Sequence, residues 1–249
     1  MHARGDDAAA LAHYIPVMVK ILLIVAPIAL LVIWTTVMSR LSAQRLKARS
    51  RLLKNDQLER ALRRLAETAG VEHISVRVLD EPMINGLVTP TGDIFVTRGL
   101  IDAVRGGRIT PPEFASVVAH ELGHMALGHT RRRTLDVAIA QAVHTVVGGL
   151  LARLIPVIGW YLARLLSMVF VTTLSRKDEF EADRYATALM IRSGLGAEPQ
   201  ARMLEKLLDL TPGADALEGP AGWLASHPPV RQRAEAIREN ARRWADAAG

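Results

Sequence analysis

The stretch HELGHMALGH, residues 120–129, decides the fold, because it places three histidines and a glutamate in an otherwise apolar segment. His120 and His124 are four residues apart, so on an α-helix they share a face, one turn from each other. Two imidazoles so placed can bind one metal ion, and Glu121 has the position of the general base in the His-Glu-x-x-His pattern. The alternative is a pair of surface histidines. The apolar neighbours disfavour it, since buried histidines without partners cost free energy.

The third histidine, His129, does not extend this motif. It follows His120 by nine residues, which places it about 180° around a continuous helix. The longer pattern His-Glu-x-x-His-x-x-Gly-x-x-His is not met, because Leu127 and Thr130 occupy its glycine and final histidine positions. We therefore expect Gly128 and His129 to end the helix, with His129 near the carboxyl-terminal dipole.

A third metal ligand has to come from another segment, because a catalytic zinc ion keeps three protein ligands and one water. The candidate is DEFEAD, residues 178–183. Glu179 and Asp183 share a helix face, whereas Glu181 points away. Glu179 fits as the ligand and Asp183 as the outer carboxylate that a metal-bound histidine usually needs. The alternative is a solvated acidic face opposite the neighbouring basic residues.

The rest of the chain predicts an α+β fold that is mostly helical, with a small antiparallel sheet. Helical spacing of leucines follows the cap residue Asn55 and stops at Gly70. Alternating or turn-flanked apolar stretches predict strands within 73–80, 83–88 and 93–100, the last running into a short helix. Thr110 and Glu113 predict a capping box for the helix that carries the histidines. Further helices are expected at 176–193, at 198–210 and after Pro228.

The first 39 residues predict a membrane anchor. Residues 21–38 are 18 residues without a charge, and the apolar segment extends back to Tyr14. The alternative is a cleaved signal peptide, but the preceding MHARGDD is not basic and no clear cleavage site follows. Residues 40–64 hold nine Lys or Arg and only two acids, which places them on the cytoplasmic side unless they are simply one solvated helix face.

A second apolar stretch, residues 137–174, has Arg153 and Arg164 as its only fixed charges. Because it joins the histidine motif to the acidic candidate, it must cross the membrane twice or not at all. We expect a helical hairpin that turns within IPVIGW, residues 155–160, and dips into or crosses the membrane. Helices that pack on the catalytic domain and touch the bilayer surface are the alternative.

Composition sets further limits on function. The chain has 249 residues, a net charge of +6 and no cysteine. Disulfide scaffolds, thiolate metal sites and cysteine nucleophiles are therefore excluded. Aromatic residues are few and do not alternate with basic ones, so nucleic-acid binding has no support.

Several segments together resemble the HtpX-like zinc metallopeptidases, the group that includes the CAAX prenyl proteases and the mitochondrial inner-membrane quality-control peptidase. The resemblance runs from about Leu58 to Ile237. The matching segments, in the order of the family, are NGLVTPTGDIFVTRGLID, VVAHELGHMALGH, SRKDEFEADRYA and SHPPVRQR.

The resemblance implies a zincin-like metallopeptidase domain at 40–249 and a role for each matching residue. One zinc ion would be bound by His120, His124 and Glu179, with Glu121 as general base and acid and Asp183 orienting the site. His227 would stabilise the oxyanion of the tetrahedral intermediate. Asn85 and Gly86 would lie on the edge strand that receives substrate, where the family usually has Asn-Ala. Judged by its own neighbours, His227 is equally well explained as a helix cap before Pro228.

The resemblance implies a membrane-anchored zinc endopeptidase that hydrolyses misfolded or membrane proteins. Its partners would be protein substrates and the lipid bilayer. The alanine- and arginine-rich composition suggests a bacterial source, so we expect the membrane to be the bacterial inner membrane. The basic residues after the apolar segment predict that the catalytic domain lies in the cytoplasm. One alternative is a CAAX-type processing protease, although such relatives enclose the site in many spans. The other is a non-enzymatic, metal-stapled membrane scaffold or pseudoprotease, which the intact Glu121 disfavours.

Overall fold

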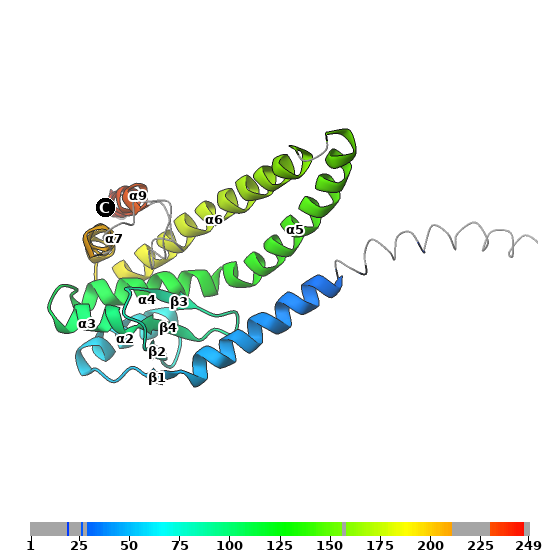
Figure 1. Ribbon diagram of the computed structural model, residues 1–249. Helices are drawn as coiled ribbons and strands as arrows, with labels where there is room; N and C mark the ends of the chain where they lie inside the picture. Colours follow the sequence, from blue (N-terminus) through cyan, green and yellow to red (C-terminus); the bar gives the residue numbers. More distant parts are fainter. Residues whose placement is uncertain (1–18, 20–25, 27–28, 156–157, 211–229, 247–249) are drawn as a thin grey trace, which may run out of the picture. The chain divides into compact units, whose positions relative to one another are not determined.

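The computed structural model describes residues 19, 26, 29–155, 158–210 and 230–246 (Figure 1). The chain divides into two compact units. One unit comprises residues 40–133 and 172–249, and the other comprises residues 1–39 and 134–171. We describe each unit by itself.

Four strands form a mixed sheet in the described part of the first unit. They are β1 (Ser50–Leu52), β2 (Val76–Leu79), β3 (Gly86–Val88) and β4 (Ile94–Thr97), in the order β1-β2-β4-β3. The predicted antiparallel sheet is wrong at one pairing, because β2 and β4 are parallel. The segment after β2 carries the chain past the central position, so that β3 forms the edge and β4 returns between them. The sequence pattern did not predict β1.

The helices of this unit begin and end at residues suited to those positions. They are α2 (Asp56–Ala69), α3 (Arg98–Arg105), α4 (Pro111–Ala126), α7 (Glu198–Leu210) and α9 (Val230–Asp246). Asn55 accepts hydrogen bonds from the first turn of α2, and Gly70 ends that helix with a φ of 70°. Thr110 and Glu113 form the predicted capping box of α4.

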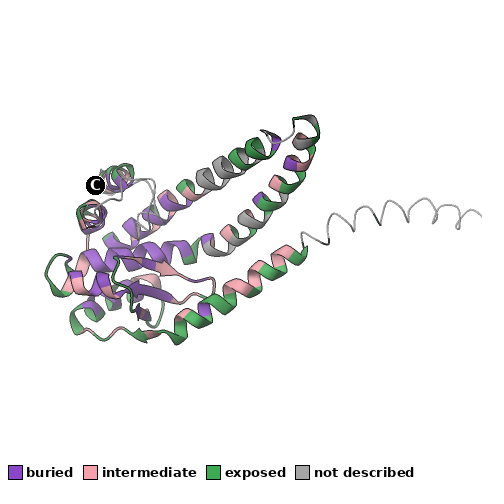
Figure 2. Ribbon diagram, viewed as in Figure 1, coloured by how far each residue is buried: buried purple, intermediate pink, exposed green. Residues whose placement is uncertain are grey.

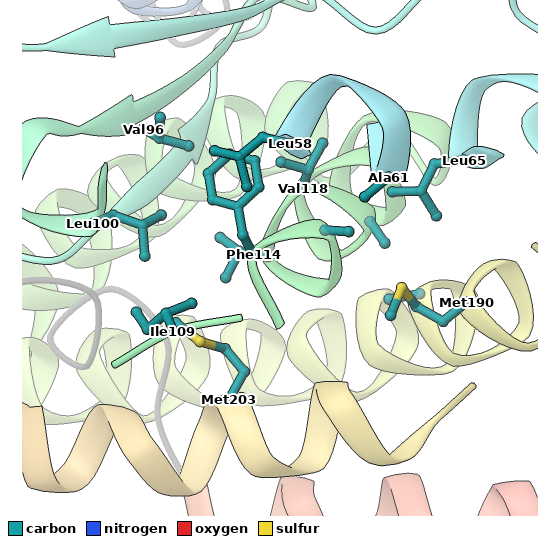
Figure 3. Close-up of a cluster of buried hydrophobic side chains, with 14 of the residues drawn as sticks. Leu58, Ala61, Leu65, Val96, Leu100, Ile109, Phe114, Val118, Met190 and Met203 are labelled. Atoms are coloured by element: carbon teal, nitrogen blue, oxygen red, sulfur yellow. The ribbon is translucent and has the colours of Figure 1, made fainter. Parts of the chain in front are cut away.

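The hydrophobic core surrounds α4, the helix that carries the histidines. Side chains from α2, the sheet, α4, α7 and the carboxyl-terminal part of α6 (Ile158–Arg192) meet there, with Phe114 fully buried among them (Figure 3). Figure 2 shows that buried residues dominate the two central strands, β2 and β4, and α4. The histidine helix is thus held on several sides before any metal is bound.

Two long helices connect the histidine motif to its acidic partner. α5 spans His129–Leu154 and α6 spans Ile158–Arg192, so the boundary between the two helices falls at the region 155–160 where the turn was predicted. α6 begins well before the predicted residue 176 and runs through the acidic motif without a break. Within the second unit, Gly148 of α5 packs against the Trp160 ring of α6.

The predicted anchor at 21–38 lies partly outside the described residues. The chain is helical from 29 to 48. In the part of the chain that the structure describes, no helix has the length and apolar character required to cross a membrane.

Removing the Phe114 ring tests the core. We expect Phe114→Ala to lower the free energy of unfolding by about 3–5 kcal/mol, because it leaves a cavity between α4 and its neighbours. Urea denaturation followed by circular dichroism measures this change. The control, Val71→Ala, removes an exposed side chain and should stay within about 0.5 kcal/mol of the parent. Equal losses for the two variants would contradict the assignment of Phe114 to the core.

Candidate metal centre

The metal centre depends on a close crossing of α4 and α6. A β-carbon placed on Gly123 would lie 2.8 Å from the Ala182 carbonyl oxygen and 3.0 Å from its Cα. Only a glycine at this position lets the two backbones approach so closely. Gly123 lies inside the histidine motif and Ala182 inside DEFEAD, so the crossing brings the two motifs together.

The crossing places three candidate ligand atoms at similar separations. The His120 Nε2 atom lies 3.1 Å from His124 Nε2 and 3.3 Å from Glu179 Oε2, and His124 Nε2 lies 3.4 Å from Glu179 Oε1. A tetrahedral zinc ion bound at about 2.0–2.1 Å sets its ligand atoms roughly 3.3 Å apart, so the three residues fit this ion. All three side chains are buried.

The protonation of His124 also suits a ligand. Burial is the main reason why its pKa falls to about 4, with the charge of His120 acting in the same direction. The imidazole is therefore neutral at pH 7, and neutral imidazole is the form that binds metal.

Asp183 contacts the second ring nitrogen of His120. Its Oδ1 atom lies 3.0 Å from His120 Nδ1, on the ring edge opposite the metal-facing nitrogen. Burial alone would raise the pKa of Asp183, but the charge and hydrogen bonds of Arg233 outweigh burial and hold it well below its usual range. An ionised Asp183 can accept a hydrogen bond from the Nδ1–H group and so orient His120, the arrangement expected for a metal-bound histidine.

Arg233 is a site residue that the sequence analysis missed. Its guanidinium is fully buried and donates to both oxygens of Asp183, at 2.6 and 2.9 Å, while another nitrogen lies 3.0 Å from Glu179 Oε2. Arg233 thus places one positive charge against two buried carboxylates beside the candidate ligand histidines. A sequence signal existed, because Val230, Arg233 and Ile237 follow helical spacing, which puts an arginine on the buried face of α9.

Glu121 lies next to the ligands on the buried face of α4. Burial is the main reason why its pKa rises to about 7, with the charge of Glu179 adding to the effect. A hydrogen bond from the Val88 backbone acts in the opposite direction. Glu121 can therefore exchange a proton near neutral pH.

The predicted substrate residues lie beside Glu121. Gly86 begins β3, and a β-carbon there would lie 2.8 Å from Val117 Cγ1 and 3.6 Å from Glu121 Oε1. Gly86 therefore lets the edge strand lie close against α4. The Asn85 backbone N–H donates to Thr97 Oγ1, and its side-chain oxygen is buried without a hydrogen-bond partner in the part of the chain that the structure describes. The other predicted residue, His227, lies outside the described residues.

His129 makes contacts that the sequence analysis did not predict. α4 ends before Gly128, which has a φ of 70°, so the predicted helix end is present, and the buried His129 begins α5. Its Nδ1 atom lies 3.0 Å from His124 Nδ1, and its Nε2 atom lies 3.1 Å from Glu181 Oε2. Helical spacing could not predict these contacts, because it does not describe the path of the chain after a left-handed residue.

Comparison with known proteins agrees with this geometry. The sequence matches peptidase family M48 over residues 52–241, more than half of the chain. The chain belongs to peptidase family M48. The predicted family resemblance is therefore confirmed, and the match includes the ligand residues as well as Arg233.

Individual relatives cover the same region. The chain is 31% identical over 178 residues to the mitochondrial metalloendopeptidase OMA1 of Arabidopsis thaliana, an alignment covering 69% of this chain and 33% of the relative. It is 28% identical to the metalloprotease LoiP of Escherichia coli, covering 63% of this chain and 58% of the relative. It is 27% identical to the protease HtpX of Pseudomonas aeruginosa, in an alignment that covers 72% of this chain and 70% of the relative. The chain thus spans less than two thirds of the first two of these relatives.

The close helix crossing can be tested at Gly123. We expect Gly123→Ala to weaken zinc binding at least several-fold, because the new methyl group pushes α4 away from Ala182 and separates the histidines from Glu179. Competition with a chromophoric chelator measures the affinity. Gly149→Ala is the matched control, since a β-carbon there meets nothing within 4 Å. Unchanged affinity in Gly123→Ala would show that the crossing does not set the ligand geometry.

Proposed function

We propose that this chain is a membrane-associated zinc metalloendopeptidase that hydrolyses misfolded or membrane proteins. One observation carries the proposal: His120, His124 and Glu179 converge on one point with the separations that zinc requires, beside the buried Glu121. The relatives OMA1, LoiP and HtpX are named as a metalloendopeptidase, a metalloprotease and a protease, which supports the same activity. In this proposal residues 40–249 form the peptidase domain and residues 1–39 its amino-terminal region.

Each residue of the centre then has a chemical task. His120, His124 and Glu179 would hold one zinc ion, which when bound supplies a Lewis acid that polarises the scissile carbonyl and acidifies water. The Glu121 carboxylate takes the proton of the attacking water and passes it to the leaving amine. Asp183 keeps the His120 ring oriented, and the adjacent positive charge of Arg233 keeps Asp183 ionised and also lies against Glu179.

The edge strand suits an extended peptide substrate. β3 pairs with β4 on one side, and no other described strand pairs with its outer side. A peptide that added to this edge would be held by backbone hydrogen bonds, which depend little on its sequence. Asn85 and Gly86 would contact it next to Glu121. We assign His227 to oxyanion stabilisation from the family resemblance.

Contact with the bilayer is supported by one face of α5. Large apolar side chains recur there at helical spacing and are about half exposed: Leu135, Ile139, Val143, Val146 and Leu150. An exposed apolar row of this length is uncommon on a surface that faces water and suits a lipid surface or the interior of a membrane. We propose that the 137–174 hairpin lies in or on the bacterial inner membrane and that the catalytic domain faces the cytoplasm.

Glu121→Gln tests the reaction. The amide cannot act as a base, so we expect hydrolysis of casein to fall at least about 100-fold while zinc content stays at one ion per chain. Fluorescent casein and metal analysis of the purified protein give the two measurements. Chelation should abolish the parent activity, and added zinc should restore it. Full turnover by Glu121→Gln would refute the endopeptidase assignment, and an inactive parent that retains zinc would favour the metal-stapled scaffold.

Because the chain has no cysteine, a single introduced thiol can report contact with lipid. We expect an environment-sensitive dye on Val146→Cys to shift to the blue in phospholipid vesicles and to be quenched by spin-labelled lipids, because Val146 lies on the exposed apolar face of α5. The same dye on Arg60→Cys, at an exposed position of α2, is the control. Equal quenching at the two positions would contradict bilayer contact by α5.

A further inference from the structure

We propose that His129 and Glu181 form a hydrogen-bonded relay that fixes the imidazole of His124 for metal binding. This role makes both of them positioning residues and rests on the proposed function, because it assumes that His124 is a zinc ligand. Neither His129 nor Glu181 is part of the His-Glu-x-x-His motif.

The contacts form an unbroken path from the buried His124 through the buried His129 to the partly exposed Glu181. Glu181 Oε2 lies 3.1 Å from His129 Nε2, and His129 Nδ1 lies 3.0 Å from His124 Nδ1. His124 Nε2, the other ring nitrogen, faces His120 and Glu179. The side chain of His129 is 2% exposed, so water does not compete effectively for either of its nitrogens.

Only one arrangement of protons agrees with both the path and a metal on His124. Nε2 of His124 must be free of a proton to bind metal, so its neutral ring carries the proton on Nδ1. That N–H donates to Nδ1 of His129, which must then carry its own proton on Nε2. The Nε2–H group of His129 donates in turn to the Glu181 carboxylate. Every donor in the path has an acceptor.

The two zinc-binding histidines are therefore supported in parallel ways. His120 is held directly by a carboxylate, Asp183. His124 is held by a carboxylate through one intervening imidazole. An outer hydrogen bond of this kind fixes the tautomer and the ring orientation, and its loss typically costs about 10–100-fold in metal affinity.

A second metal site is the competing explanation, because His129, Asp178 and Glu181 also offer three grouped ligand atoms. Arg132 argues against it. Its guanidinium donates to Asp178 and lies 3.9 Å from Glu181, so a cation already balances the carboxylates of this cluster. The relay leaves all of these contacts in place, whereas a second metal ion would have to displace the arginine.

The test compares zinc affinities of the purified full chain by competition with a chromophoric chelator. We expect His129→Leu to weaken zinc binding about 10–100-fold, because the acceptor for His124 is lost. His129→Asn should recover most of this loss, since its side-chain oxygen can take the place of Nδ1. His144→Leu, a histidine substitution in the other compact unit, should leave the affinity unchanged and is the matched control. Cobalt absorption spectra should change in the same order as the zinc affinities.

A second pair of variants tests the relay even if His129→Leu does not fold. Glu181→Gln keeps an acceptor for His129 and should bind zinc nearly as well as the parent, whereas Glu181→Leu should bind it more weakly. Equal affinities for Leu and Asn at residue 129, or for Leu and Gln at residue 181, would overturn the relay. The relay would also be overturned if metal analysis found two zinc ions per chain and Asp178→Asn lost one of them.

These outcomes separate the relay from the proposed function, because zinc affinity is measured without peptide hydrolysis. A chain that shows the expected order of affinities but does not cleave casein would refute the peptidase proposal and support the relay. A chain that cleaves casein while its zinc affinity ignores residue 129 would refute the relay alone.

Discussion

The close approach of α4 and α6 is the constraint on which the rest of the structure depends. Gly123 and Ala182 let the two backbones nearly touch, and only at that separation can side chains as short as histidine and glutamate meet at one point. The core around Phe114 holds α4, and Ala186 and Met190 extend the same core along α6. Hydrophobic packing therefore fixes the distance between α4 and α6, and at this distance the polar side chains can contact one another.

The polar side of the crossing is a set of buried charges that are stable only together. An isolated carboxylate or guanidinium in the interior costs several kcal/mol, and this cost is offset when each ion has partners. Arg233 serves Asp183 and Glu179 at once, and Asp183 also accepts from His120. Such a network specifies one geometry, because moving any member leaves another without its partner. The network therefore holds the three candidate metal ligands in a fixed arrangement, which a binding site requires.

Local patterns in the sequence predicted much of this. The capping box of α4, the bounds of α7 and the turn between α5 and α6 follow from short-range rules. The parallel pairing of β2 with β4 could not be foreseen, because it depends on how the chain crosses between strands. The helix end at Gly128 was predicted, but the contact of His129 with His124 was not, because helical spacing does not describe the path of the chain after a left-handed residue. Arg233 was missed because its partners lie 50 residues earlier.

The sharing of one guanidinium by two carboxylates has a consequence for substitutions on α9. Arg233 is fully buried on this helix and supplies the positive charge that Asp183 and Glu179 share. Without that charge, two carboxylates would lie buried near each other, an arrangement that favours their protonated forms. A protonated Asp183 would hold His120 less firmly, so a substitution on a helix that carries none of the three candidate ligands could still disable the centre.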